Sequence, residues 1–273
     1  MVKLFVIGAG RMGGAIAGGL ISKGVFSADD MAAFDVNEIA AKSFAQHVGC
    51  CAFSRYDEAR ETLKSAPAVL LAVKPQTLEV ALKAWRDLDV DFSQKLLISI
   101  VAGVKIECLS QLVSGTRIVR VMPNTPALVG CGAAAYAPGP GATSEDELLV
   151  EKILSAVGMA RRMKEGDLDA VTALSGSGPA YVFAFIQALA DGGVAEGLSR
   201  EAAQALAVQT VLGSAEMVAR SGEHPAVLKD AVTSPGGTTI RALEVLEDRG
   251  FSGAVIQAVR AAARRSRELG GCK

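Results

Sequence analysis

Three glycines near the N-terminus have the spacing of a phosphate-binding turn. Gly8, Gly10 and Gly13 form Gly-x-Gly-x-x-Gly directly after the apolar residues 4–7, and apolar residues then recur every four positions over residues 12–20. In such a turn the first glycine permits the bend, the second lets a diphosphate approach the backbone, and the third lets a helix lie close to a strand. The N-terminus of that helix attracts phosphate. The stretch therefore predicts strand, turn, helix and a phosphate ligand.

Asp35 strengthens this prediction because of where it falls. It lies 22 residues after the third glycine and ends the next apolar stretch, residues 31–34. An acidic residue at this spacing accepts a hydrogen bond from a ribose hydroxyl in dinucleotide sites. The context favours a dinucleotide site over a merely structural turn.

Two further motifs are expected at strand ends. Residues 72–75, Ala-Val-Lys-Pro, follow one apolar run, and residues 122–126, Met-Pro-Asn-Thr-Pro, follow another. Ligands of open α/β sheets bind at the carboxyl edge, so Lys74 is placed to approach a cofactor or substrate, although a solvated lysine explains it equally well. The two prolines of the second motif hold the side chains of Asn124 and Thr125 near the same edge. A rigid loop without ligand contacts is the alternative there.

Two glycine-containing motifs lead into helices in the second half of the chain. In Ser-Gly-Ser-Gly-Pro, residues 175–179, Ser177 is expected to cap a helix with Pro179 in its first turn. Ser-Pro-Gly-Gly-Thr-Thr, residues 234–239, is the better candidate for an anion pocket made of backbone N–H groups, suited to a carboxylate. Thr238 or Thr239 is expected to cap the following helix, which leaves the other hydroxyl for a substrate.

The elements that position these motifs change in character along the chain. Up to about residue 164, short apolar runs alternate with helical patterns, which predicts an α/β fold with a doubly wound, Rossmann-type sheet. The runs expected to be strands are 68–73, 96–100, 116–122, 132–137 and 159–163. From residue 165 to 273 only helical patterns remain. We therefore predict a dinucleotide-binding domain at 1–164 and an all-α domain at 165–273.

The helix after Pro179 is apolar around nearly its whole circumference. A helix of this kind requires burial on every side. A domain of about 105 residues with few aromatic side chains has a thin core of its own, so we predict that the helical domain dimerises.

Composition excludes several classes of partner. The 28 basic and 29 acidic residues give a net charge of −1, so no nucleic acid or anionic membrane is expected as a partner. The apolar runs are too short to cross a bilayer. The five cysteines lack Cys-x-x-Cys spacing, so we expect no metal site and reduced thiols in a cytoplasm.

Taken together, the motifs resemble those of pyrroline-5-carboxylate reductases. The resemblance rests on the glycine turn at 8–13, residues 72–75, 122–126, Ser-Gly-Ser-Gly-Pro-Ala-Tyr-Val-Phe at 175–183, and residues 234–239, and so it spans nearly the whole chain. The last two motifs are specific to that family. The resemblance implies NADPH- or NADH-dependent reduction of 1-pyrroline-5-carboxylate to L-proline, the final step of proline biosynthesis, by a homodimer that often belongs to a larger ring such as a decamer.

The resemblance also implies roles for individual residues. Backbone N–H groups around Gly236, Gly237 and Thr238, with the Ser234 hydroxyl, are expected to bind the substrate carboxylate, and Thr239 the ring nitrogen. Because a cyclic imine is activated by protonation, positioning by Thr239 and Ser234 replaces a strong general base. The residues expected to bind the cofactor are Gly8, Ala9, Gly10, Arg11, Met12, Gly13, Asp35, Asn37, Ala72, Val73, Lys74, Pro75 and Asn124.

Asp35 departs from the family pattern, in which NADPH-preferring members carry a small polar residue. A carboxylate there repels a 2′-phosphate, and no lysine or arginine lies between residues 36 and 41 to compensate. We therefore expect both cofactors to be used, with NADH more competitive than in the family generally.

Other activities fit less well. A β-hydroxyacid dehydrogenase needs a lysine in the second domain, and none occurs between Lys164 and Lys229. An Asp-His dehydrogenase would depend on His224, beside Pro225 in an expected interhelical loop. A non-catalytic nucleotide-sensing regulator would not need residues 234–239.

Overall fold

A computed structural model describes residues 2–270. The chain forms two compact units: the first comprises residues up to Ser177 together with the chain from Ala262 onward, and the second is Gly178–Ala261. This division differs from the predicted boundary after residue 164, which stays a prediction.

The first unit is built on one eight-stranded sheet in the order β3-β2-β1-β4-β5-β6-β7-β8. Its strands are β1 (Leu4–Ile7), β2 (Met31–Phe34), β3 (Cys51–Phe53), β4 (Ala68–Leu71), β5 (Leu96–Ser99), β6 (Arg117–Met122), β7 (Gly132–Pro138) and β8 (Gly158–Arg162). All neighbouring pairs are parallel except β6 and β7. The outward order from β1 on both sides confirms the predicted doubly wound α/β sheet.

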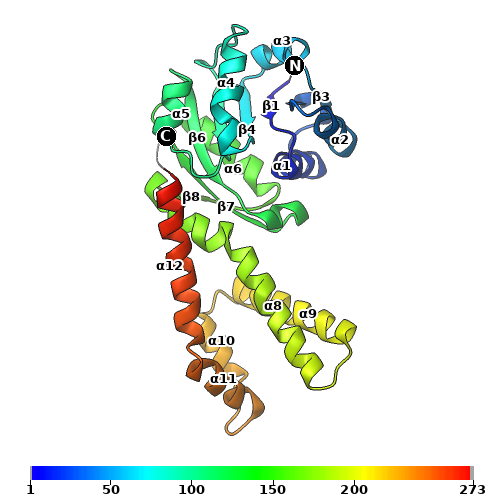
Figure 1. The fold of residues 1–273 in the computed structure, drawn as a ribbon, viewed down its shortest axis with the longest axis vertical. Coiled ribbons are helices and arrows are strands. Elements are labelled where there is room, and N and C mark those ends of the chain that lie inside the picture. Colours follow the sequence, from blue (N-terminus) through cyan, green and yellow to red (C-terminus); the bar gives the residue numbers. More distant parts are fainter. Residues whose placement is uncertain (1, 271–273) are drawn as a thin grey trace. The chain divides into compact units, whose positions relative to one another are not determined.

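Helices cover both faces of this sheet (Figure 1). Alternate residues of β1 point to opposite faces: Leu4 and Val6 belong to one apolar core, and Phe5 and Ile7 to the other. The first core is closed by α1 (Arg11–Ser22), α2 (Glu38–Val48) and α6 (Ser144–Ser155), and the second by α3 (Tyr56–Ser65), α4 (Leu78–Arg86) and α5 (Ile106–Leu112). The sheet is therefore buried on both sides.

Two features of the sheet were not anticipated. The edge strand β3 has only three residues and is half-exposed, so its sequence carries no long apolar run. The strand β7 runs antiparallel to β6, with Met122 opposite Ala135. Between them, residues 125–129 form a short 3₁₀ helix, η3, which is too short for a crossover and turns the chain back instead.

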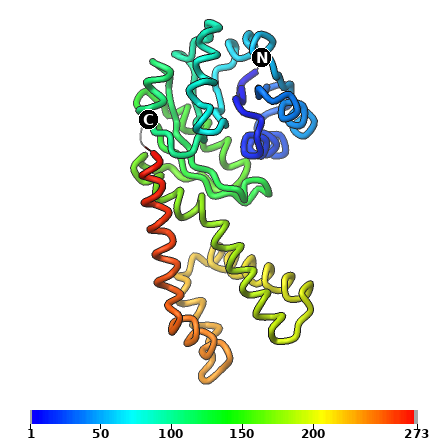
Figure 2. Tube along the Cα trace, viewed as in Figure 1, coloured from blue at the N-terminus to red at the C-terminus, as the bar shows by residue number. Residues whose placement is uncertain are grey.

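The second half of the chain is helical. After the 3₁₀ turn η4 (Glu165–Asp167), α7 (Leu168–Val171) continues into a π-helical segment, η5 (Thr172–Gly176). The remaining helices are α8 (Gly178–Ala195), α9 (Arg200–Ser221), α10 (Pro225–Ala231), α11 (Thr238–Asp248) and α12 (Phe251–Leu269). The last turns of α12, at the red end of the trace, belong to the first unit (Figure 2). There the Ser266 hydroxyl donates to Asp169 at 2.6 Å.

The second unit has little apolar core within one chain. Its buried cluster consists of Ala190, Ala203 and Ala207, between α8 and α9. Large apolar side chains of these two helices remain exposed, among them Val182, Phe183, Leu189, Leu206 and Leu212. Surface of this kind marks an interaction site.

One helical stretch, Glu165–Ala195, is long and apolar enough to cross a bilayer by length and composition, and 11% of the window that passes this test is buried. Its apolar residues are interrupted by polar ones, so the length of uninterrupted apolar runs does not reveal it. A helix that packs against other protein passes the same test, so the absence of a membrane partner stays a prediction.

Candidate functional site

The glycine turn between β1 and α1 is open to a ligand. Gly8 has φ +105°, and a β-carbon there would lie 2.6 Å from the Ala72 carbonyl oxygen, so only glycine fits. Gly10 is the N-cap of α1, without a side-chain cap, and no atom lies within 4 Å of where its β-carbon would be. The first N–H groups of α1 are thus accessible, and the residues present fit a bound diphosphate.

Asp35 follows β2 and is held in place by two backbone N–H groups. Its Oδ2 accepts from Ala9 at 2.9 Å and its Oδ1 from Asn37 at 2.9 Å. The carboxylate therefore stands beside the glycine turn, as the sequence spacing predicted, and each oxygen retains a lone pair for a ribose hydroxyl.

Asn37 has a structural role as the N-cap of α2. Its Oδ1 accepts from the backbone N–H groups of Ile39 and Ala40 and so caps α2. Sequence reasoning assigned Asn37 to the cofactor without noticing this cap, which the asparagine before a helical pattern indicates. Its side-chain nitrogen remains available to a ligand.

The motif at 72–75 lies beside the glycine turn. Ala72 directly follows β4 and its N–H donates to the Ile7 carbonyl. Lys74 precedes the 3₁₀ turn η2 (Pro75–Thr77), and no ion pair joins it to another side chain among the described residues. Arg11, the first residue of α1, is likewise without one there. Both cations are available to an anionic ligand.

Asn124 follows β6 and is nearly buried, with 8% of its surface exposed. Its Oδ1 accepts from the Ala133 N–H at 2.8 Å, and its Nδ2 donates to the Ser175 carbonyl at 3.0 Å. The structure thus brings together two motifs that the sequence analysis treated separately.

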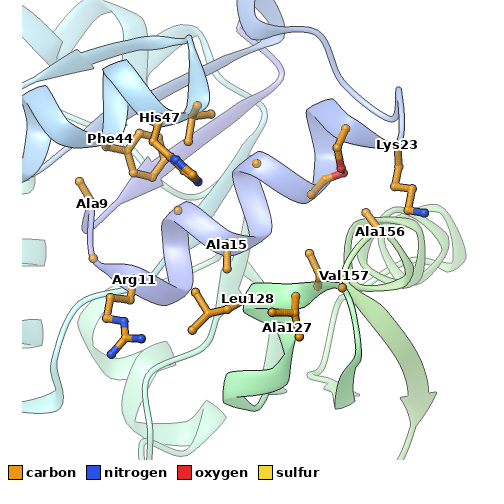
Figure 3. A pocket seen from close by; sticks show the side chains of 18 of the residues that line it. Ala9, Arg11, Ala15, Lys23, Phe44, His47, Ala127, Leu128, Ala156 and Val157 are labelled. Carbon is orange, nitrogen blue, oxygen red and sulfur yellow. The ribbon is translucent and has the colours of Figure 1, made fainter. Parts of the chain in front are cut away.

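A cavity of about 660 Å³ follows α1 from its N-terminus to Lys23. In Figure 3, His47 and Phe44 lie on one side of α1, and Ala127 and Leu128 on the other. Ala9, Gly10 and Arg11 line this cavity and are also predicted to bind the cofactor. The rest of the cavity was not predicted from the sequence. The sequence signal is the recurrence of glycine at 10, 14 and 18, one face of a helix.

The residues expected to bind substrate lie in the second unit, in the loop after α10 and in the first turn of α11. The Gly237 N–H donates to the Ser234 carbonyl at 3.1 Å, which closes a turn with Pro235 and Gly236 at its centre. Gly236 has φ +66°, as a type II turn requires after proline. A β-carbon at 237 would overlap the Ser234 Oγ, so glycine there lets this hydroxyl lie at the mouth of α11.

The prediction that a threonine caps α11 is wrong. The helix begins at Thr238, and its N-cap is Gly237, without a side-chain cap. The N–H groups of the first turn and the hydroxyls of Thr238 and Thr239 are thereby left for a ligand. This suits an anion pocket better than the predicted arrangement did.

The predicted cap by Ser177 is also wrong. Ser177 has right-handed helical dihedrals, and its N–H donates to the Thr172 carbonyl at 2.8 Å. The chain is therefore helical on both sides of this residue. Sequence reasoning missed the π-helical segment because its hydrogen bonds leave no periodic signal over five residues.

No group of residues suited to a metal ion occurs among residues 2–270. Cys50, Cys51 and Cys131 are free thiols, and burial raises the pKa of Cys50 to about 11. Cys108 is disulfide-bonded, which contradicts the expectation of reduced thiols at that position. Cys272 lies outside the described residues.

The doubly wound sheet and its open glycine turn define a dinucleotide-binding oxidoreductase, joined here to a helical unit. Residues 3–103 match the family model for "NADP oxidoreductase coenzyme F420-dependent", and residues 165–269 match "Pyrroline-5-carboxylate reductase dimerisation".

Whole-chain comparisons agree with these matches. Pyrroline-5-carboxylate reductases of Arabidopsis thaliana and Methanosarcina acetivorans are each 45% identical, over 98% of this chain and 95% and 98% of theirs. The solved reductase of Coxiella burnetii is 32% identical with a TM-score of 0.91, covering 99% of both chains. That of Plasmodium falciparum, with NADP bound, is 36% identical with a TM-score of 0.86, covering 99% of this chain and 98% of its own. The chain belongs to the pyrroline-5-carboxylate reductase family.

Proposed function

We propose that this protein reduces 1-pyrroline-5-carboxylate to L-proline with NADPH or NADH. The observation that carries this proposal is the agreement of sequence and fold with pyrroline-5-carboxylate reductases over nearly the whole chain. The turn at Ser234 and the uncapped mouth of α11 support it, because they suit a small ring acid.

The chain's own residues supply binding and orientation. The N-terminal turn of α1 binds the diphosphate, and Asp35 accepts from the ribose of the adenosine half. Bound as NADPH or NADH, the cofactor supplies a hydride for the carbon of the C=N bond. Residues 72–75, which are also predicted to bind the cofactor, begin beside the turn, where Ala72 and Val73 lie against Gly8.

The substrate residues act on the two polar ends of the ring acid. Backbone N–H groups at Gly236, Gly237 and Thr238, with the Ser234 hydroxyl, hold the carboxylate. The Thr239 hydroxyl orients the ring nitrogen, which is already protonated and retains its proton as the C=N bond becomes C–N. No strong general base is required, so reaction depends on placement.

The finer features of this function are also proposals. The exposed apolar side chains of α8 and α9 are covered by a second copy, which gives a homodimer, in a cytoplasm and open to assembly into a ring such as a decamer. Residues 165–273 act as the substrate-binding and dimerisation domain, and residues 1–164 as the dinucleotide-binding domain.

The direct test adds pyrroline-5-carboxylate to the purified protein and follows the loss of reduced-cofactor absorbance with each cofactor. We expect substrate-dependent oxidation and L-proline as product. A folded protein that binds the dinucleotide but turns over no pyrroline-5-carboxylate would be a regulator, and turnover of β-hydroxyacids instead would indicate the related dehydrogenase.

A further inference from the structure

We infer that Asn124 is a positioning residue, which acts through the backbone of Ser175 rather than through the cofactor. The inference rests on the proposed function for its kinetic consequences, but the two hydrogen bonds on which it is based lie within the first unit. The hydrogen bond from Asn124 to Ser175 links the Met-Pro-Asn-Thr-Pro motif to the Ser-Gly-Ser-Gly-Pro motif.

The orientation of the Asn124 amide is fixed by its two neighbours. The Ala133 N–H is a donor and must meet Oδ1, at 2.8 Å, and the Ser175 carbonyl is an acceptor and must meet Nδ2, at 3.0 Å. With 8% of the residue exposed, water does not replace either bond readily.

Pro179 removes one backbone donor that the Ser175 carbonyl could otherwise accept from. In an α-helix the carbonyl of residue 175 accepts from the N–H of residue 179, and proline has none. Ser175 lies in the π-helical segment, and the bond from Asn124 gives its carbonyl a side-chain donor in place of the one that residue 179 would supply in a continuous α-helix. One motif thus compensates for the proline of the other.

A second contact holds the same two segments together. A β-carbon on Gly176 would lie 2.5 Å from the Met122 methyl carbon, so glycine there lets the π-helical segment lie directly against the end of β6. The preceding helix α7 is itself anchored, since Leu168 packs against Ala135 and Ala137 of β7. Asn124 therefore completes an anchor for the segment that leads into α8.

This anchor matters for chemistry because the chain passes at Ser177 from the unit that holds the cofactor residues to the unit that holds Ser234 and Thr239. The proposed reaction needs groups from both sets. A looser segment at 175–177 would leave the binding of either ligand nearly intact and reduce the fraction of time spent in reactive geometry. The expected signature is a loss of kcat without a matching loss of dinucleotide affinity.

Asn124→Asp tests the donor with little change in volume. At neutral pH it places a carboxylate oxygen against the Ser175 carbonyl, and we expect kcat to fall at least tenfold, while the Kd for NADH and NADPH changes less than about threefold. As pH falls the carboxyl protonates and donates again, so the ratio of variant to wild-type kcat should recover. A loss of fold alone would not recover in this way.

Two further variants keep the test independent of stability. Thr116→Val removes a different buried donor, the hydroxyl that bonds the Phe92 carbonyl at 3.0 Å, and should leave kcat unchanged. Pro179→Ala restores an N–H for the Ser175 carbonyl, so Asn124→Ala should cost less kcat in that background than alone.

Hydrogen exchange of a peptide spanning residues 172–180 supplies a readout without activity, and we expect faster exchange in Asn124→Asp than in Thr116→Val. If Asn124→Asp and Thr116→Val showed the same hydrogen exchange and the same kcat, the inference would be overturned. A tenfold weaker dinucleotide Kd at unchanged kcat would overturn it in favour of direct cofactor binding. An inactive wild type would refute the proposed function, whereas the exchange and Kd measurements would still decide the role of Asn124.

Discussion

The Asp35 carboxylate accepts a hydrogen bond of 2.9 Å from the Ala9 N–H, inside the glycine turn. The residue expected to select between NADH and NADPH therefore also supports the turn expected to bind the diphosphate. Cofactor choice and cofactor affinity are coupled through this one side chain, and substitutions at 35 must be chosen to separate them.

Asp35→Asn should shift cofactor use toward NADPH. It keeps an acceptor for Ala9, loses the bond from the Asn37 N–H and removes the charge that repels a 2′-phosphate, so kcat/KM for NADPH relative to NADH should rise about tenfold, or about 1.4 kcal/mol. Asp35→Ala, which also loses the bond to Ala9, should weaken both cofactors. Kinetics with each cofactor measure the ratio. A wild-type preference for NADPH above roughly a hundredfold would count against this role of Asp35.

Thr239→Ala should lower kcat more than it weakens NAD(P)H binding, because the hydroxyl orients the ring nitrogen and not the cofactor. We expect a loss of about tenfold or more in kcat, and substantial recovery in Thr239→Ser, which keeps the hydroxyl. Steady-state kinetics and a dinucleotide titration provide the comparison. An unchanged kcat in Thr239→Ala would refute the assignment.

Gly236→Ala and Gly250→Ala form a matched pair. Both glycines have left-handed φ values, +66° and +70°, and open space where a β-carbon would lie. Each substitution should cost about 1 kcal/mol of unfolding free energy. Only Gly236→Ala should raise KM for pyrroline-5-carboxylate, because its turn shapes the mouth of α11. Equal KM values in the two variants would remove the turn from the substrate site.

Phe183→Glu should dissociate the proposed dimer. Phe183 of α8 is 64% exposed in the single chain, and a carboxylate there could not be buried against a second copy without a large desolvation cost. Leu148→Glu, on α6 and 66% exposed, is the control and should leave the mass unchanged. Light scattering at micromolar concentration measures whether the wild type and each variant have the mass of a monomer or of a dimer. A monomeric wild type would contradict the dimer outright.

Asp146 should make stability depend on pH in the acid range. Burial raises the pKa of this carboxyl, but hydrogen bonds from Arg117 and Thr143 outweigh burial and lower it below its usual value of 3.8. The unfolded chain then binds the proton more readily, so the contribution is complete above about pH 4 and is lost as pH falls through the lowered pKa. Asp146→Asn should cost about 1–3 kcal/mol at neutral pH. Urea unfolding should show this difference shrinking below about pH 4; a constant difference would mean that the carboxylate is not the cause.

Much of the first unit follows from sequence because its signals are local. The glycine turn, the apolar run before it and Asp35 at the end of the next strand each reflect backbone geometry within a few residues, and the structure places them side by side. The antiparallel β7 was beyond reach, since strand direction depends on what η3 does to the path of the chain.

The sequence by itself determined the doubly wound fold and the residue types at the N-termini of α1 and α11, because strand burial and turn geometry depend on residues close together in the chain. Only the tertiary structure decided how their polar atoms are used: that Gly237, not a threonine, precedes α11, that Asn37 caps α2, and that Asn124 bonds to Ser175. The physical reason is that a hydrogen-bond partner 51 residues away, as Ser175 is from Asn124, leaves no trace in the spacing of residues along the chain.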